Sequence, residues 1–539
     1  MAVVVALLMG VSAWAAPPAS GGGAVQKERL EEALARAEAG LKANPGDAAL
    51  LEAKVDALLG LGRTLEARQT AVAGLSKSPG LRYRAGICEA RFGRMKEAVV
   101  AWRPLLADPT LAPEAFYASF QALVASGRIR EAEALFSEAE SKLPYLPPAL
   151  VGLAFRLGLA PADLPKKLKA WSEKDPADAD FFSTLSQVCG AADGPLMAVS
   201  SAGKMPLEMT VKERSERIET SSLTWGPVSG GPIAGSQVTQ GPTGVLNPSS
   251  GSQSYGSGVK DKATTEGQKT GTISVAPRPV VEVALNGSKK EPFVLDSAAG
   301  AVLLAQRMAK NLDLKPLGTG EFRLPGMEAP RVAQWVLIKE MAVGPMTFKN
   351  VPALVMDEAS EFWKDTGGVL PLWLFREYAV RYDRRHSTLA LYPSGTTAEA
   401  AMGTGSFPVK SLWLDGRLFA ETRIQDQPFR FCLLDTTLGG TYLEERHIDT
   451  LGASLKTSRY GSQSERGLVG IIQSGVADNV SVTLGPTRIQ MPTILVGSLF
   501  PDDAVECSGV VGRNLLDLFE VYFDCQAGVL ALKGYERPR

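Results

Sequence analysis

The chain has 539 residues, with 45% apolar and 21% charged side chains, which is typical of an ordinary soluble protein of roughly two to four domains. Its formal net charge of −1 gives no electrostatic reason to expect a nucleic acid or an anionic membrane as a partner. The five cysteines are too few for a disulfide scaffold, and a histidine-rich metal site or a Ser-His-Asp hydrolase is disfavoured by only two histidines, His386 and His447.

Residues 1–16 have the pattern of a secretory signal peptide. An apolar run from Ala2 to Val11 precedes Ala13-Trp14-Ala15, which fits the small-x-small cleavage rule, although no Lys or Arg comes before the run. The alternative is a short buried helix. Because the run is too short to span a bilayer, we expect an exported protein, periplasmic or secreted, with a bacterial-type signal and no membrane span after its removal.

Residues 25–192 are predicted to be helical, and a short pattern recurs within them. Gly62-Arg63-Thr64-Leu65-Glu66-Ala67 is followed by similar segments that start at Gly93 and Gly127, 31 and 34 residues further on. Each glycine lies where one helix must turn into the next, since glycine tolerates the left-handed cap conformation. The region resembles tetratricopeptide repeats, about four of them. The resemblance implies a concave groove for a partner, and the alternative is a helical spacer or cap.

Residues 193–277 are predicted to be mostly a flexible linker. From about Ser221 to Ala276 the sequence is dominated by Gly, Ser, Thr, Pro and Gln, and large apolar residues nearly vanish. Such a composition cannot bury enough surface to offset the entropy of ordering the chain.

The remaining sequence alternates like β-strands and repeats itself. Phe293-Val294-Leu295-Asp296-Ser297 is an apolar run that leads into Asp and a hydroxyl residue, and Phe431 to Thr436 has the same pattern 139 positions later. Gly344-Pro345 is matched in the same way by Gly485-Pro486. Matched landmarks in the same order indicate an internal duplication. A short helical stretch is expected after each Asp, over 303–312 and 442–451.

The predicted fold class is therefore multidomain, with N-terminal all-α helical-hairpin repeats followed by an all-β bilobal region. The predicted boundaries are 1–16 for the signal peptide, 25–192 for the helical repeats, 193–277 for the linker, 278–400 for a first β unit and 401–539 for a second β unit.

Two β units related by a pseudo-twofold axis can bring Asp296 and Asp435 face to face. Two negative charges in direct contact cannot both persist, so the carboxyls would share one proton. A water between them would then be the nucleophile: the ionised Asp takes its proton, and the protonated Asp stabilises the developing oxyanion.

Residues 279–536 resemble aspartic peptidases of the retropepsin/pepsin type. The Asp-[Thr/Ser]-Gly motif of that family falls on Asp296-Ser297-Ala298 and on Asp435-Thr436-Thr437. Its apolar-apolar-Gly element falls on Val510-Val511-Gly512 and on Val369-Leu370-Pro371. The resemblance implies that Asp296 and Asp435 form the catalytic dyad, and that Ser297 and Thr436 hydrogen-bond across the interface of the units.

The sequence departs from the family at three positions. Ala298 and Thr437 replace the motif glycine, which in the family permits close backbone approach, and Pro371 replaces a backbone N–H with a ring. The resemblance further implies a flap near 318–326 or 461–475.

The predicted activity is that of an exported aspartic endopeptidase, with the helical repeats recruiting a substrate or partner. The alternative is an inactive pseudo-peptidase that binds peptides or proteins as a scaffold. Neither hypothesis calls for a cofactor, a metal or a nucleic acid, and a monomer suffices for the site because both carboxylates lie in one chain. Cys507 and Cys525 could form a disulfide in an exported protein or remain free thiols.

Overall fold

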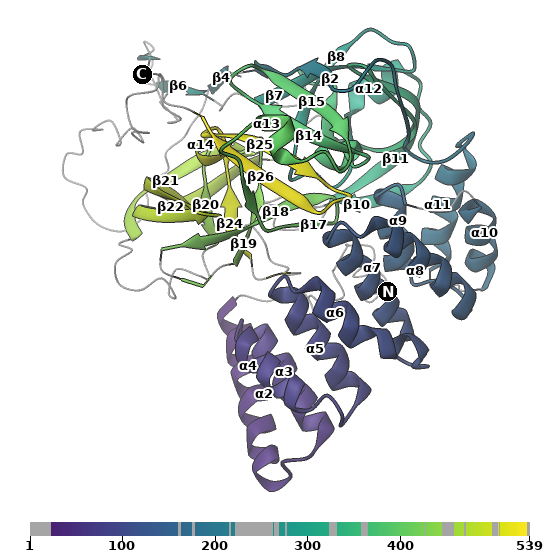
Figure 1. Cartoon of the computed structure of the whole chain (residues 1–539), viewed down its shortest axis with the longest axis vertical. Helices are drawn as coiled ribbons and strands as arrows, with labels where there is room; N and C mark the ends of the chain where they lie inside the picture. Colours follow the sequence, from purple (N-terminus) through teal and green to yellow (C-terminus); the bar gives the residue numbers. More distant parts are fainter. Residues whose placement is uncertain are drawn as a thin grey trace.

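In the computed structural model the chain begins with helices and continues into β-sheets, as predicted (Figure 1). The predicted signal peptide lies outside the described residues, and so does most of the predicted linker. No described helix is long and apolar enough to cross a membrane. The structure describes residues 23–159, 163–174, 178–214, 217–220, 262–263, 269–274, 278–322, 331–356, 365–425, 427–428, 430–444, 457–467, 470–497, 505 and 507–535.

The helical region consists of short helices joined by tight turns. Gly62, Gly93 and Gly127 have φ angles of 71°, 67° and 73°, so the predicted left-handed turns are confirmed. Whether these helices are tetratricopeptide repeats stays a prediction. The helices are α2 (Gly23–Ala43), α3 (Ala48–Gly60), α4 (Thr64–Ala73), α5 (Pro79–Arg91), α6 (Met95–Trp102), η1 (Arg103–Ala107), α7 (Ala112–Ala125), α8 (Ile129–Lys142), α9 (Pro148–Arg156), α10 (Leu164–Lys174) and α11 (Ala179–Gly190).

The first sheet has the strand order β1-β12-β9-β13-β8-β7-β11-β10, with β3 paired to β7 and a further pairing between β12 and β11. Buried aliphatic residues fill the strands at its centre. Its strands are β1 (Ala198–Ser201), β3 (Lys212–Arg214), β7 (Arg278–Leu285), β8 (Glu291–Asp296), β9 (Val302–Ala305), β10 (Thr319–Phe322), β11 (Arg331–Val343), β12 (Met346–Met356) and β13 (Gly368–Pro371).

The second sheet has the same strand arrangement as the first, except that strand β1 of the first sheet has no counterpart in it. Its order is β17-β18-β19-β24-β20-β23-β22-β21, with a further pairing between β18 and β22. In each sheet the strand that leads to an aspartate pairs in parallel with the strand of the apolar-apolar-Gly element. The internal duplication itself stays a prediction. The strands are β17 (Ser411–Leu414), β18 (Arg417–Ile424), β19 (Arg430–Leu434), β20 (Tyr442–Glu444), β21 (Thr457–Gly467), β22 (Gly470–Leu484), β23 (Thr487–Gly497) and β24 (Cys507–Val511).

A further sheet joins the two β units. Its order is β16-β26-β25-β14-β15-β2, and the antiparallel pairing of β14 with β25 brings Ala379 opposite Asp524. Because each unit contributes neighbouring strands, this joint sheet fixes the two units relative to each other. Its strands are β2 (Leu207–Thr210), β14 (Tyr378–Asp383), β15 (Thr388–Pro393), β16 (Phe407–Val409), β25 (Phe519–Asp524) and β26 (Val529–Gly534).

The helices expected after the aspartates are only partly present. In the first unit, 302–305 is strand β9, and helix α12 (Gln306–Asn311) follows it. In the second unit Tyr442–Glu444 is strand β20, and residues 445–451 of the expected helix lie outside the described residues. The apolar run Val302-Leu303-Leu304-Ala305 is buried along its whole length. A run of that kind is compatible with a buried strand or a helix, so its periodicity could not decide.

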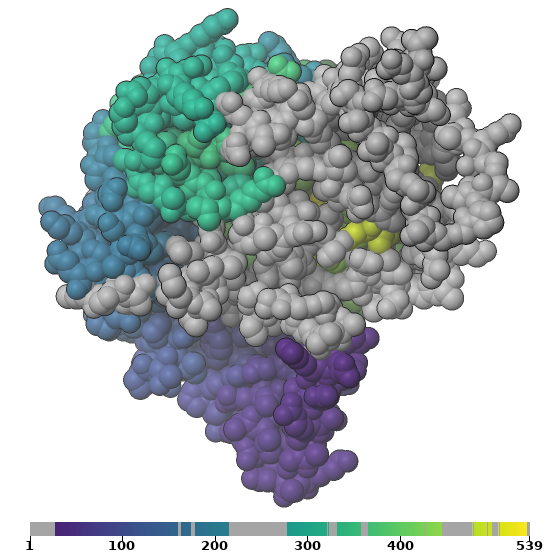
Figure 2. Space-filling view, turned by 180° about the vertical axis from the view of Figure 1, so that it is seen from behind, coloured from purple at the N-terminus to yellow at the C-terminus, as the bar shows by residue number. Residues whose placement is uncertain are grey.

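The helical region packs directly against both β units. Arg156, at the end of α9, forms an ion pair with Asp415 of the second unit at 2.8 Å. Trp373 of the first unit donates a hydrogen bond from Nε1 to the carbonyl oxygen of Leu157 at 3.0 Å. Viewed from behind, the first helices (purple) project away from the β region, whereas the later helices (blue) lie beside the first unit (teal; Figure 2).

The predicted linker 193–277 does not simply separate the helices from the β region. Residues 198–214 contribute β1, β2 and β3, and β2 buries Leu207 and Met209 in alternation. Strand β3 then pairs with β7, so that Arg214 lies opposite Arg278. Residues 215–277 are therefore an insertion within a β-hairpin of the first unit. The described part of the insertion forms β4 (Arg217–Thr220), β5 (Lys262–Ala263) and β6 (Lys269–Ser274).

The corresponding hairpin of the second unit needs a connection of only two residues. Leu414 lies opposite Arg417, and Asp415-Gly416 connects them with φ angles of 52° and 76°, as in a type I′ turn. We predict that replacing residues 215–277 with Asp-Gly keeps the fold and leaves the chain at least as stable, because a shorter loop costs less closure entropy. Thermal unfolding and circular dichroism would measure this.

The matched control removes one residue more, 214–277. That change shifts the β3–β7 register by one residue, which moves each side chain of β3 to the other face of the sheet. Glu213 would then lose its ion pair with Arg513, so the control should lose stability. Equal loss of stability in both variants would contradict the assignment of 215–277 as an insertion.

Candidate active site

Each candidate aspartate lies at the end of a buried strand. Asp296 is the last residue of β8, and Asp435 directly follows β19. Both strands are apolar and lie between two neighbouring strands of their sheet. The aspartates at their ends are therefore buried: Asp296 is 1% exposed and Asp435 is 5% exposed. Carboxylates are rarely buried to this degree unless they are paired.

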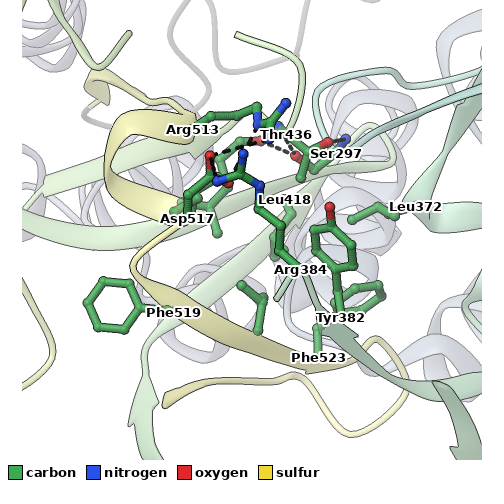
Figure 3. Close-up of a pocket in the computed structure, with 13 residues that line it drawn as sticks. Ser297, Leu372, Tyr382, Arg384, Leu418, Thr436, Arg513, Asp517, Phe519 and Phe523 are labelled. Atoms are coloured by element: carbon green, nitrogen blue, oxygen red, sulfur yellow. Dashed lines mark hydrogen bonds and ion pairs between the residues drawn. The ribbon is translucent and has the colours of Figure 1, made fainter. Parts of the chain in front are cut away.

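Reciprocal hydrogen bonds join the residues that follow the two aspartates. Ser297 Oγ donates to the carbonyl oxygen of Leu434, and Thr436 Oγ1 donates to that of Leu295 at 2.9 Å. The backbone N–H of Ser297 donates to Thr436 Oγ1 at 3.2 Å, and that of Thr436 donates to Ser297 Oγ at 3.1 Å. The two hydroxyls therefore connect the turns directly, and Figure 3 shows Ser297 and Thr436 side by side.

A small cavity of about 20 Å³ lies beside these hydroxyls. It is mostly apolar, but one wall carries the ion pairs of Asp517 with Arg384 and with Arg513 (Figure 3). Arg513 also pairs with Glu213 at 2.8 Å. Since Glu213 belongs to β3, this network attaches the segment before the insertion to the second unit, next to the site.

The electrostatics of the two carboxyls are coupled. Burial raises the pKa of Asp296 well above its ordinary value, and the negative charge of Asp435 raises it further. Burial also raises the pKa of Asp435, against hydrogen bonds from Thr437 and Leu438 that lower it. Two carboxyls that interact in this way titrate together rather than independently.

The structure accommodates both replacements of the motif glycine. Ala298 is 1% exposed, and its backbone N–H donates to Asp296 Oδ1 at 2.7 Å. Thr437 directs its hydroxyl at the neighbouring carboxylate: its N–H and its Oγ1 each donate to Asp435 Oδ1 at 2.7 Å. The additional hydroxyl at this position therefore becomes a hydrogen-bond donor to Asp435.

Pro371 and Gly512 occupy matching places beside the aspartates. Pro371 is in register with Asp296, and its φ of −69° suits the proline ring. Gly512 follows Val511, which is in register with Leu434. A Cβ atom on Gly512 would lie 1.9 Å from the carbonyl oxygen of Gly440, so glycine is required there for close backbone approach.

Part of the chain is similar to a known peptidase family. Residues 281–372 match the family model for aspartyl proteases. The chain is also similar in structure to an aspartic proteinase from Irpex lacteus, at 11% identity and a TM-score of 0.32, with 48% of this chain and 95% of that chain covered. The search of curated proteins gave no significant match. The family match supports an aspartic-peptidase-like β region, and Asp435 lies beyond the matched residues.

Sequence reasoning did not single out Arg278. This residue is 3% exposed at the start of β7, and its charge lowers the pKa of both aspartates. A signal was present: Arg278 and Arg417 each lie 18 residues before an aspartate of the repeat. Arg278 is the more buried of the two, so the second copy is not an electrostatic equivalent of the first.

The other predicted features have mixed outcomes. The flap segments are only partly described: Thr319–Phe322 forms β10, and β21 pairs with β22. All five cysteines are buried, and none of them forms a disulfide, so the Cys507–Cys525 bond that the sequence allowed is not present. Within the described residues no group of three or more His, Cys, Asp or Glu side chains is arranged to hold a metal ion.

Proposed function

We propose that the chain is an aspartic-type endopeptidase whose dyad is Asp296 and Asp435. The observation that carries this proposal is the reciprocal bonding of Ser297 and Thr436, because it holds two buried, electrostatically coupled carboxyls at the junction of two matched sheets. A shared proton gives the pair both a base and an acid. One carboxylate accepts a proton from a bound water, and the other carboxyl donates a hydrogen bond to the developing oxyanion.

We also propose export of the chain and a recruiting role for its helical region. The sequence pattern of residues 1–16 supports export. The contacts of Arg156 and Leu157 with the two β units support recruitment, because a partner bound to the helices would be held at a fixed position relative to the dyad.

The test is peptide hydrolysis by the purified full chain. Denatured protein and peptide libraries would be incubated between about pH 3 and pH 8, the range over which a coupled carboxyl pair titrates. Asp296→Asn and Asp435→Asn should each lower kcat by at least on the order of 10³-fold, since the dyad acts as a unit. Asp313→Asn, a change at a side chain that is 84% exposed, is the matched control and should leave the rate unchanged.

A hydroxyl-containing analogue of the tetrahedral intermediate should inhibit the wild type. Cleavage that persists in both dyad variants would contradict the proposal. If the wild type cleaves nothing but binds the analogue and loses this binding in both variants, the chain is instead a peptide-binding pseudo-peptidase.

A further inference from the structure

The two aspartates have different hydrogen-bond environments, although the loops that hold them match. Asp435 Oδ1 accepts three hydrogen bonds, from Thr437 N and Thr437 Oγ1 at 2.7 Å each and from Leu438 N at 2.9 Å. Asp296 Oδ1 accepts from the N–H of Ala298 at 2.7 Å, and the N–H of Ala299 acts on the same carboxyl. The difference is one side-chain hydroxyl, since Ala298 carries a methyl group where Thr437 carries a hydroxyl.

The Thr437 hydroxyl is well placed to act on charge. Thr437 is 7% exposed, so its hydroxyl bonds the carboxylate with little competition from water. A donor to a carboxylate favours the ionised form, and such bonds are stronger than neutral ones. The hydroxyl therefore favours the negative charge on Asp435 over Asp296.

We propose that Thr437 is a positioning residue that makes Asp435 the ionised member of the pair and leaves the shared proton on Asp296. The directions of the pKa shifts agree: Asp296 is raised well above its ordinary value, and the Thr437 hydroxyl is first among the groups that lower the pKa of Asp435. Arg278 lowers the pKa of both carboxyls and so does not by itself choose between them.

The consequence for hydrolysis rests on the proposed function. The oxygen of the water bonds to the carbonyl carbon of the peptide while Asp435 accepts a proton from that water. At the same time Asp296 gives its proton to the carbonyl oxygen. The resulting gem-diol then returns a hydroxyl proton to Asp296. As the C–N bond breaks, the leaving nitrogen takes the proton from Asp435. One water is consumed, an acid and an amine are formed, and the dyad returns to its starting protonation state.

The experiment follows protonation directly and needs no turnover. The carboxyl carbons of isotope-labelled aspartates would be titrated by NMR in the full chain, with assignment from Asp296→Asn and Asp435→Asn. In the wild type the Asp435 signal should be that of the ionised form at pH values where Asp296 is still protonated. Thr437→Val keeps the side-chain shape but removes the hydrogen-bond donor, so it should raise the pH at which Asp435 titrates by about one unit.

Two further variants keep the test decisive. Thr437→Ser restores a hydroxyl and should titrate like the wild type. Thr437→Ala is the second variant without a donor, should the valine variant not fold, because the matching turn already holds Ala298. Ser has the hydroxyl of Thr but not its methyl group. If Thr437 acted only through packing, Thr437→Ser would not restore the wild-type titration of Asp435.

The inference would be overturned if Asp435 titrated at the same pH in Thr437→Val or Thr437→Ala as in the wild type. It would also be overturned if, as the pH is lowered, Asp435 of the wild type became protonated before Asp296. Failure of the proposed function is a separate outcome: a wild type with the expected titration order and no hydrolysis contradicts the peptidase but supports the role of Thr437. If hydrolysis occurs, the acid limb of kcat/KM should move upward by about one pH unit in Thr437→Val and not in Thr437→Ser.

Discussion

Gly512→Ala is expected to be among the most destabilising single substitutions in the chain, at a cost of about 3 kcal/mol in the free energy of unfolding. The added Cβ would lie 1.9 Å from the carbonyl oxygen of Gly440 and 2.9 Å from that of Leu438. Both contacts are to backbone, so no side-chain rotation can relieve them. The φ of Gly512 is −89°, which any residue can adopt, so the cost comes from overlap alone.

The same substitution should disturb the site, since the displaced loop contains the N–H of Leu438 that donates to Asp435. Thermal and denaturant unfolding would measure the loss of stability. Gly534→Ala is the matched control, because Gly534 also follows a buried strand segment but a Cβ there meets nothing within 4 Å. Similar stability in the two variants would mean that the 438–440 loop is not held as tightly against Gly512 as the structure places it.

The main elements of this fold could be predicted because their sequence patterns are local. A glycine every 31 to 34 residues marks a helix turn, and the φ angles of Gly62, Gly93 and Gly127 agree. The paired aspartates could be predicted from repetition, since the same apolar run precedes Asp296 and Asp435. Patterns of this kind report on secondary structure and on duplication without knowledge of distant contacts.

The start of the first β unit could not be predicted for the opposite reason. Strand β3 has three residues, and the strand that it pairs with begins at Arg278, beyond a long insertion. A short strand has too little periodicity to be recognised alone. The Gly- and Ser-rich composition of the insertion also favoured a linker between domains, because composition does not indicate which segments pair on either side of it.

The candidate site was predicted in its residues but not in its energetics. The sequence showed that Thr437 replaces the motif glycine, but it did not show that the Thr437 hydroxyl donates to Asp435. The direction of a hydroxyl depends on backbone geometry that the sequence does not specify. Arg278 was overlooked because a single arginine at a strand start is usually solvated, and its burial becomes evident only in the assembled sheet.

Asp296→Asn is expected to stabilise the chain at neutral pH, by on the order of 1–3 kcal/mol, because Asn is neutral at every pH, whereas folding of the wild type must bring a proton onto the buried Asp296, whose pKa is raised. In Tm this corresponds to a rise of about 2–4 °C per kcal/mol. The amide oxygen of Asn can still accept the hydrogen bond from Ala298, so the packing of the turn is retained. Asp313→Asn, at an exposed side chain, is the control for the substitution itself and should leave Tm unchanged.

The pH dependence identifies the cause. The folded-state pKa values of Asp296 and Asp435 are raised, so between the unfolded and folded pKa values the native state binds more protons than the unfolded state. Wild-type stability from this pair is then complete below the unfolded pKa of about 3.9 and decreases as pH rises through the folded values. The advantage of Asp296→Asn should therefore be absent at acid pH and grow toward neutral pH. A gain in stability that does not depend on pH would assign the effect to packing. A loss of stability at neutral pH would show that the wild-type carboxyl pair is net favourable. Growth of the advantage with pH would mean that the fold tolerates an electrostatic cost at this one place, as expected of a pair held for chemistry rather than for stability.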